Sequence, residues 1–243
     1  MSLLSIRAIN KNFGGLWALK NVSFDVQAGR IHGLMGANGA GKTTLFSIVA
    51  GNLRASSGRV LFDGETIDTL RPDQVCRRGL ARTFQIVRPF PAMTVQQNVE
   101  TAILFGRNRP PSMSRAAELA GDVLEQTALA AQAHKPAATL TLAGRKRLEL
   151  ARALGTEPRL LLLDEVMAGL TPVEVQEMMA TIVRIKQRYE LTVLIIEHVV
   201  GALTGLSDWI TVLHHGECIA EGPPATIAGN AAVLTAYFGT GQA

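Results

Sequence analysis

The amino-acid sequence predicts an α/β fold with a mainly parallel sheet and an inserted helical subdomain. Three observations predict this fold. The first third of the chain carries short apolar segments separated by glycine turns, the middle is alanine-rich with helical periodicity, and the part after residue 150 alternates apolar strands with helices. Short apolar strands that alternate with helices are typical of a parallel sheet covered on both faces.

The first third of the chain is expected to form strands and one helix. Turn signals at Gly14–Gly15 and Ala28–Gly29 separate the apolar segments. The segment after Gly41 predicts a helix over residues 42–50. The expected strands are residues 4–9, 22–26, 31–35 and 60–62.

The middle of the chain predicts two helices. Residues 94–105 and 114–131 are rich in alanine and have apolar residues at helical spacing. The polar residues 107–111 between them include prolines and predict a loop. This change in pattern indicates a helical subdomain inserted into the α/β core.

The last third predicts buried strands at residues 160–163, 192–196 and 210–213. Thr171 and Pro172 suit the N-cap and first position of the helix that follows the first of these strands. The core-facing stripe expected on that helix is Val175, Met178, Met179, Ile182 and Ile185.

Composition excludes several classes of protein. The chain has 243 residues, 47% hydrophobic and 18% charged, which supports a sizeable core and excludes a disordered chain. The net charge of +4 is scattered without a dense basic run, so no nucleic-acid partner is expected. Cys76 and Cys218 make neither a disulfide framework nor a zinc pattern, which suits a reducing cytosol.

No segment approaches the roughly 18 to 20 consecutive apolar residues of a membrane helix. Residues 1–10 lack the basic and apolar regions of a signal peptide. We therefore expect a cytoplasmic protein, which leaves docking onto a membrane protein open.

Residues 36–43, Gly-Ala-Asn-Gly-Ala-Gly-Lys-Thr, match a phosphate-binding loop and lie between an expected strand and an expected helix. Gly39 and Gly41 let successive backbone N–H groups face one point, where the helix dipole adds positive potential. Lys42 supplies a cation for the outer phosphates, and Thr43 offers a hydroxyl to Mg²⁺. The alternative is a glycine-rich turn that binds nothing.

Two acids end the strand at residues 160–163. This strand delivers Asp164 to the carboxyl edge of the sheet, where α/β proteins bind ligands. Asp164 is expected to hold Mg²⁺ or its water, and Glu165 to act as the general base on the attacking water. The alternative is that both acids cap the next turn.

Polar residues also stand near two other strand ends. His198 follows the strand at residues 192–196 and is expected to reach the γ-phosphate, although a lone histidine there is often structural. Gln85 lies between the strand-rich start and the helical insert, where it can touch Mg²⁺ and sense the insert. His214 and His215 have no partners at metal-ligand spacing and are expected to be turn residues.

These residues, in this order, resemble an ATP-binding cassette (ABC) ATPase subunit. The resemblance covers nearly the whole chain: residues 36–43 match Walker A, Gln85 the Q-loop, residues 160–165 Walker B and His198 the switch histidine. It implies that Phe13 stacks on adenine, with Trp17 as the alternative. The nucleotide-binding residues that it implies are Phe13, Gly36, Asn38, Gly39, Ala40, Gly41, Lys42, Thr43, Thr44, Thr141 and Ala143.

The resemblance also implies the architecture. A single ABC ATPase domain would span residues 1–243, with a P-loop NTPase core and an N-terminal antiparallel β subdomain in residues 1–87 and 156–243. The helical subdomain would span residues 88–155 and carry the signature loop. It implies ATP and Mg²⁺ as cofactors.

The signature loop departs from the usual Leu-Ser-Gly-Gly-Gln. Thr141 takes the serine position, Ala143 the second glycine position and Gly144 the glutamine position. We expect Ala143 at negative φ, because a methyl group is tolerated there and its N–H can still contact a γ-phosphate. Val166 and Thr171 also depart, since the family usually has proline and aspartate at these positions.

The closer resemblance is to ATPase subunits of branched-chain amino acid uptake systems, through residues 11–19, 82–90, 168–172, 196–198 and 236–239. It implies a second, similar but distinct ATPase subunit, two transmembrane permeases and, indirectly, a solute-binding protein. The chain would then be peripheral on the inner face of the cell membrane. Val87, Arg88, Pro89 and Phe90 are expected to line the groove for permease loops.

Other functions remain as alternatives. Importers of urea, amides or aromatic acids resemble this group equally well at this level. A non-transport ABC ATPase usually has two cassettes or a long coiled coil, for which 243 residues leave no room. A GTPase would need an Asn-Lys-x-Asp motif, but Asn10-Lys11 continues as Asn12-Phe13. A small-molecule kinase is the remaining P-loop alternative.

Overall fold

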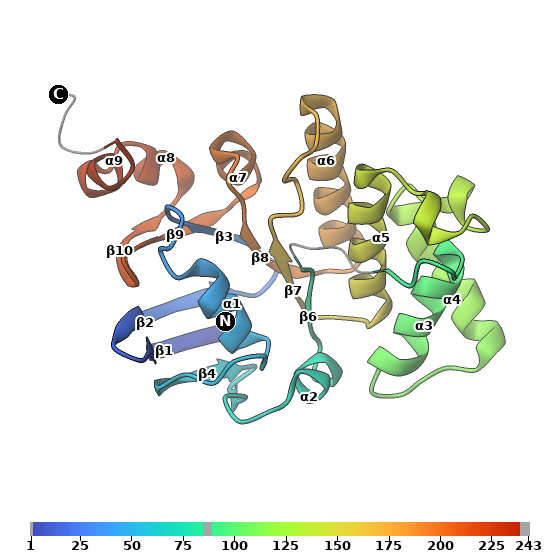
Figure 1. Cartoon of the computed structure of the whole chain (residues 1–243), viewed down its shortest axis with the longest axis horizontal. Helices are drawn as coiled ribbons and strands as arrows, with labels where there is room; N and C mark the ends of the chain where they lie inside the picture. The colour runs from blue at the N-terminus through green and yellow to red at the C-terminus, as the bar shows by residue number, and fades with distance from the viewer. Residues whose placement is uncertain (1, 85–88, 239–243) are drawn as a thin grey trace. The chain divides into compact units, whose positions relative to one another are not determined.

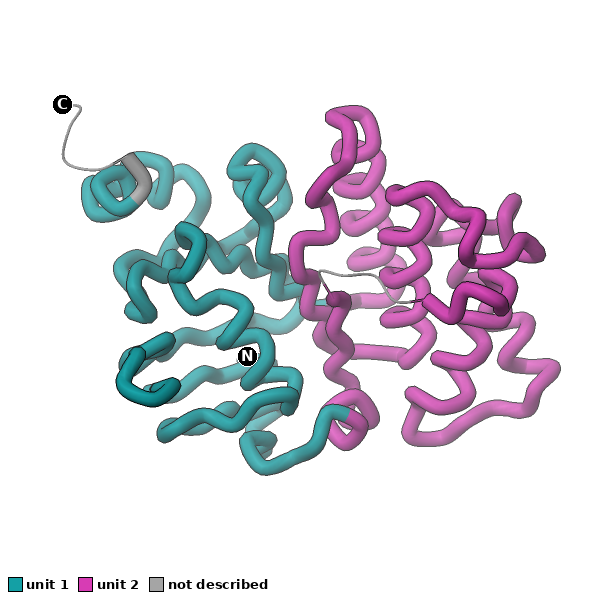
Figure 2. Tube along the Cα trace, viewed as in Figure 1, with its two compact units in different colours: residues 1–72, 192–243 teal, residues 73–191 magenta. Residues whose placement is uncertain are grey.

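The computed structural model describes residues 2–84 and 89–238 (Figure 1). The chain divides into two compact units (Figure 2). Unit 1 consists of residues 1–72 and 192–243, and unit 2 consists of residues 73–191. The helices within residues 2–84 and 89–238 all lack the length and apolarity that crossing a lipid bilayer requires.

Unit 1 contains an antiparallel sheet of the order β2-β1-β4-β5. The pairing of Ser5 with Asp25 and of Leu4 with Phe62 sets its register. The expected antiparallel β subdomain is confirmed, but its strands extend beyond the predicted segments because their polar ends continue the ladder. The strands are β1 (Ser2–Phe13), β2 (Leu16–Gln27), β4 (Ser57–Phe62) and β5 (Glu65–Thr66).

Unit 1 also contains the strand order β10-β9-β3-β8, in which β3 is parallel to both β8 and β9 and β10 is antiparallel to β9. Every residue of β3 and β8 is buried, as is typical of parallel strands covered on both faces. The buried ring of His32 in β3 is satisfied by a 2.8 Å hydrogen bond between its Nε2 and Oγ1 of Thr211. The strands are β3 (Ile31–Met35), β8 (Thr192–Ile196), β9 (Trp209–His214) and β10 (Glu217–Gly222). The helices are α1 (Lys42–Val49), α7 (Val200–Leu206), α8 (Pro224–Ala228) and α9 (Ala231–Phe238).

Unit 2 pairs β6 (Leu80–Arg82) in parallel with β7 (Leu160–Asp164). Helix α3 packs against both α4 and α5, which Figure 1 shows as a helical group. The unit thus confirms a helical insert within an α/β protein. Its main helices are α3 (Val95–Gly106), α4 (Met113–Gln126), α5 (Leu142–Gly155) and α6 (Pro172–Arg188), with α2 (Pro72–Arg77) at its start and the short 3₁₀ helices Ala130–Gln132 and Ala137–Thr139.

Helix boundaries in unit 2 follow from local hydrogen bonds. Thr171 caps α6 through a capping box with Glu174, which confirms the predicted start. The predicted helix over residues 114–131 is wrong at its end. It stops at Gln126 because Ala128 takes a left-handed φ of 56°.

The apolar stripe of α6 differs from the prediction at one position. Thr181 is buried and Met179 is only half-buried. The hydroxyl of Thr181 donates to the carbonyl oxygen of Glu177 at 2.9 Å, so its polar atom is satisfied inside the core. The other predicted members of the stripe, Val175, Met178, Ile182 and Ile185, are buried.

Candidate functional site

A glycine loop joins the end of β3 to the start of α1 in unit 1. Gly41, the N-cap of α1, has a φ of 102°. A Cβ built on it would lie 2.5 Å from the carbonyl oxygen of Ala18, so only glycine fits without a backbone shift. Because Gly41 supplies no capping side chain, the first N–H groups of α1 form a site suited to an anion.

Lys42 lies across this loop. Its side chain is buried, and Nζ donates to the carbonyl oxygens of Gly36 at 2.6 Å and Ala37 at 3.0 Å. These contacts keep the ammonium at the mouth of the loop, where it can meet a phosphate. The predicted residues Gly36, Asn38, Gly39, Ala40, Gly41, Lys42, Thr43 and Thr44 all lie in this one loop and first turn, with Thr43 exposed.

The turn between β9 and β10 packs against the same loop. A Cβ on Gly36 would lie 2.5 Å from the carbonyl oxygen of Leu213. The backbone N–H of Gly216 donates to the carbonyl oxygen of Ala40 at 3.2 Å. His214 is half-buried and His215 is exposed, and their rings lie 4.2 Å apart. His215 is an exposed turn residue, as expected, whereas the prediction is wrong for His214, which is the half-buried last residue of β9. The turn that follows β9 packs against the phosphate loop.

Two aromatic side chains are exposed in the β1–β2 hairpin. Phe13 is 47% exposed and Trp17 is 48% exposed. The Lys11 ammonium lies 4.8 Å from the centroid of the Phe13 ring. An exposed ring face that attracts a cation can also take a flat heteroaromatic base. Both rings are exposed, and the stacking role of Phe13, with Trp17 as the alternative, stays a prediction.

His198 stands two residues beyond the end of β8, and its side chain is exposed. Leu34 of β3 pairs with Ile196 of β8 in a parallel ladder. Parallel strands end at the same edge of a sheet, so His198 and the phosphate loop lie at the same edge of this sheet. This is the edge at which α/β sheets bind ligands.

Asp164 ends β7 in unit 2 and is almost fully buried. Its Oδ2 accepts from Nη2 of Arg82 at 2.7 Å, and its backbone N–H donates to Oγ1 of Thr83 at 3.1 Å. Within the part of the chain that the structure describes, Oδ1 has no hydrogen-bond partner. A buried carboxylate oxygen without a partner suits a cation or its bound water.

Mg²⁺ prefers oxygen ligands, and two of the predicted ligands, Thr43 in unit 1 and Asp164 in unit 2, each offer oxygen atoms. The third predicted ligand, Gln85, lies outside the described residues. Residues 2–84 and 89–238 contain no cluster of three or more His, Cys, Asp or Glu side chains that could hold a metal on its own.

Glu165 follows Asp164 in a rare backbone conformation. Its φ is 53°, a left-handed value that costs a residue with a Cβ on the order of 1 kcal/mol or more. Its carbonyl oxygen accepts from Nζ of Lys146 at 3.0 Å and from the N–H of Ala168 at 3.2 Å. Such conformations occur at active sites and also in ordinary turns such as the one at Ala128, so the catalytic role of Glu165 stays a prediction.

The signature-loop residues lie at the start of α5. Thr141 is the N-cap, and its Oγ1 accepts from the N–H of Gly144 at 3.2 Å. Ala143 lies in the first turn and does not take a positive φ. The expected backbone conformation of Ala143 is therefore confirmed, and the methyl group causes no strain there.

Sequence reasoning missed Glu149, a buried acid on α5. Its Oε1 accepts from the N–H of Phe84 at 2.6 Å. Burial raises the pKa of the Glu149 carboxyl, while this hydrogen bond, Lys146 and Arg152 oppose the rise. The sequence signal was an acid inside the apolar run Leu-Glu-Leu-Ala, where an unpaired carboxylate is costly.

The residues on both sides of the predicted Q-loop are held by helices of unit 2. Oδ1 of Asn98 accepts from the N–H of Phe90 at 2.8 Å, and the Arg152 guanidinium lies 5.0 Å from the Phe90 ring centroid. Pro89 is half-buried and Phe90 is 43% exposed. Gln85, Val87 and Arg88 lie outside the described residues.

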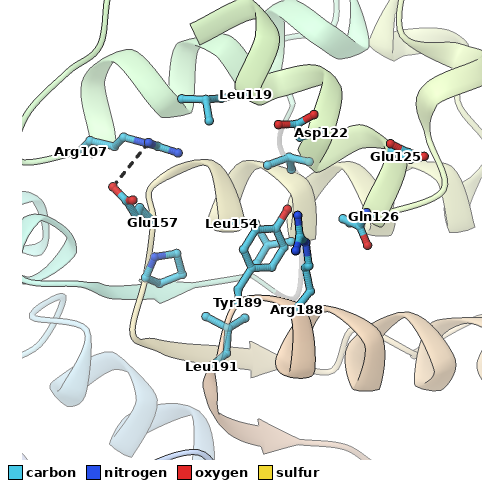
Figure 3. Close-up of a pocket in the computed structure, with 12 residues that line it drawn as sticks. Arg107, Leu119, Asp122, Glu125, Gln126, Leu154, Glu157, Arg188, Tyr189 and Leu191 are labelled. Carbon is cyan, nitrogen blue, oxygen red and sulfur yellow. Dashed lines mark ion pairs between the residues drawn. The ribbon is translucent and has the colours of Figure 1, made fainter. Parts of the chain in front are cut away.

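A pocket of about 370 Å³ lies among α4, the end of α5 and the end of α6 (Figure 3). Arg107 and Glu157 form an ion pair at its rim, with Nη1 and Oε2 3.4 Å apart. Tyr189 points into it beside Arg188 (Figure 3). None of the predicted site residues lines this pocket.

Comparisons with known proteins agree with this geometry. Residues 19–168 match the ABC transporter family, and residues 217–243 match the branched-chain amino acid ATP-binding cassette transporter family. The chain is 36% identical to the high-affinity branched-chain amino acid transport ATP-binding protein BraF of Pseudomonas aeruginosa, over 98% of each chain. It is 35% identical to the probable branched-chain amino acid transport ATP-binding protein LivG of Archaeoglobus fulgidus, over 98% of this chain and 96% of that protein.

The fold is also similar to that of a solved ATP-binding cassette. An ATP-binding cassette of an ABC transporter in its ADP conformation is similar to this chain with a TM-score of 0.87 and 30% identity. The match covers 98% of this chain and 99% of that one. The chain therefore belongs to the ABC transporter family, as one of its ATP-binding cassettes.

Proposed function

We propose that the chain is the ATP-hydrolysing subunit of an importer for branched-chain or related amino acids. The observation that carries the proposal is the sequence identity of 35 to 36%, over nearly the full length, with branched-chain amino acid transport ATP-binding proteins. The match of residues 217–243 to the branched-chain family supports it at the carboxyl end. The phosphate loop at Lys42 supplies the chemistry for a nucleotide.

The residues of the phosphate loop bind the nucleotide. Backbone N–H groups at Gly39 and Gly41 face the phosphates, Lys42 neutralises their outer charge, and Phe13 stacks on the base. Thr43, Asp164 and Gln85 would hold Mg²⁺. When bound, Mg²⁺ neutralises charge between the β- and γ-phosphates.

Two residues act on the hydrolysis step. Glu165 accepts a proton from the water that attacks the γ-phosphate, and His198 stabilises the charge that develops there. Thr141 and Ala143 contact the γ-phosphate held by a facing cassette. One chain alone then has an incomplete site and hydrolyses ATP weakly.

The assembly contains a second, similar cassette, two transmembrane permeases and, indirectly, a solute-binding protein. We place the chain on the cytoplasmic face of the membrane, where the helical subdomain, residues 88–155, docks permease loops. The exposed ring of Phe90 supports that position. Residues 1–87 and 156–243 form the remainder of one ABC ATPase domain. No nucleic acid takes part.

ATP-driven uptake into vesicles tests the function. The chain is purified with the products of its neighbouring genes and reconstituted, and radiolabelled solutes are added outside. We expect uptake of leucine, isoleucine or valine that requires internal ATP. Uptake of urea, an amide or an aromatic acid alone would assign a related importer, and the absence of any ATP-driven uptake would favour a non-transport ATPase.

The Ala143→Gly variant should change ATP hydrolysis by the assembled complex only a few-fold. Ala143 lies in α5 without a positive φ, so its methyl group costs no backbone strain. A change of a few-fold corresponds to less than about 1 kcal/mol in activation free energy. Steady-state phosphate release measures it, and a hundredfold gain would show that Ala143 marks a degenerate site.

A further inference from the structure

Lys146 is a buried lysine in the second turn of α5. Its side chain is 3% exposed, and Nζ donates to the backbone carbonyl oxygen of Glu165 at 3.0 Å. A buried ammonium is retained only where hydrogen bonds and an opposite charge compensate its lost hydration. Glu149, one turn further along α5, supplies an opposite charge that interacts with Lys146. The phosphate chemistry described above makes no use of this lysine.

The hydrogen bond from Lys146 is made to a residue, Glu165, whose backbone takes a strained conformation. Glu165 has a φ of 53°, and left-handed residues with a Cβ persist only where their surroundings enforce the conformation. Its carbonyl accepts a hydrogen bond from the following turn at Ala168 and another from Lys146. The bond from Lys146 comes from another element of the fold, helix α5.

The same turn meets α5 at a second point. Gly169 has a φ of 78°, and a Cβ built on it would lie 3.1 Å from Cδ2 of Leu142, the first residue of α5. The turn after β7 is thus packed against the first turns of α5. Lys146 is the residue of α5 that donates to the Glu165 carbonyl.

We infer that Lys146 is a positioning residue for hydrolysis: its ammonium fixes the peptide of Glu165 and thereby the direction in which the Glu165 carboxylate leaves the backbone. This inference rests on the proposed role of Glu165 as general base. Displacing a catalytic group by about 1 Å can cost about a hundredfold in rate. Thr141 is the N-cap of α5 and Ala143 lies in its first turn. The contact of Lys146 therefore links the loop proposed to close the facing site with Glu165, the proposed general base of the same chain.

The Lys146→Met variant tests the inference in the assembled complex. Methionine keeps much of the aliphatic stem and removes the ammonium donor. We expect kcat to fall at least about tenfold, while KM and the affinity for a fluorescent ATP analogue stay within about twofold. Lys135→Met removes an exposed lysine of the same unit and should leave kcat unchanged. A Lys146→Met kcat within twofold of the wild-type value would overturn the inference.

A second variant removes the concern that a lone Glu149 charge disturbs folding. Lys146→Met with Glu149→Gln removes both charges together, so neither is left buried without the other. Its kcat should fall at least about tenfold as well, since the Glu165 contact is still absent. A double variant with wild-type kcat would contradict the positioning role.

A double-mutant cycle with Glu165→Gln shows whether Lys146 acts through Glu165. Single-turnover hydrolysis by Glu165→Gln should not slow further when Lys146→Met is added. An additional tenfold loss would mean that Lys146 acts elsewhere and would overturn the inference. Rapid turnover by Glu165→Gln alone would instead remove the proposed base, so the two failures are distinguishable.

Discussion

The Glu165→Gln variant is expected to bind ATP normally and to hydrolyse it at least about a hundredfold more slowly. A positioned general base contributes about 10²- to 10⁴-fold to proton-transfer catalysis, and glutamine cannot accept the proton. The isosteric amide keeps the volume of a buried side chain that is 6% exposed. Phosphate release and retention of labelled ATP by the assembled complex measure the two effects.

The control for this variant is Glu118→Gln, which removes an exposed carboxylate that pairs with Arg115 on α4. It should retain the wild-type rate, because a surface ion pair contributes little. Hydrolysis by Glu165→Gln at more than about a tenth of the wild-type rate would assign the base to another residue.

Replacing Lys42 by alanine should weaken ATP binding about a hundredfold or more. The ammonium lies at the mouth of the phosphate loop, where its donors now meet the carbonyl oxygens of Gly36 and Ala37. Each hydrogen bond between a charged group and a phosphate is worth about 1.5 to 3 kcal/mol, and every 1.4 kcal/mol is about tenfold in affinity. Titration calorimetry on the isolated chain measures the loss.

Lys20→Ala serves as the matched control for charge in the same unit. Lys20 is 43% exposed at its side chain and pairs with Glu217, so its removal should change ATP affinity less than about twofold. Equal losses in the two variants would show a general charge effect, and unchanged affinity in Lys42→Ala would remove Lys42 from the nucleotide site.

Strands buried on both faces could be predicted closely from the sequence. The segments predicted at residues 31–35 and 192–196 have the bounds of β3 and β8, because mainly apolar segments of this length suit a strand covered on both faces. Strand β6, with three residues, and the edge strand β10 were missed. Whether such short or polar segments form strands depends on the strands they pair with and not on the β-propensity of their own residues.

Local motifs predicted the candidate site better than its supporting contacts. The phosphate loop depends on consecutive residues, so Gly41 and Lys42 could be placed from spacing alone. The pairing of Arg82 with Asp164 joins residues 82 positions apart in sequence. The acid within the apolar run at Glu149 is a local signal, but its partner, the N–H of Phe84, lies 65 positions away and cannot be predicted from the local sequence.

The most direct test of the account compares ATP hydrolysis by the isolated chain with hydrolysis by the chain assembled with its neighbouring cassette and permeases. Both samples are measured at the same chain concentration with saturating ATP and Mg²⁺. The account predicts that assembly raises the rate per chain at least about tenfold, because the facing cassette completes each site. An isolated, monomeric chain that hydrolyses ATP as fast as the assembly would contradict it.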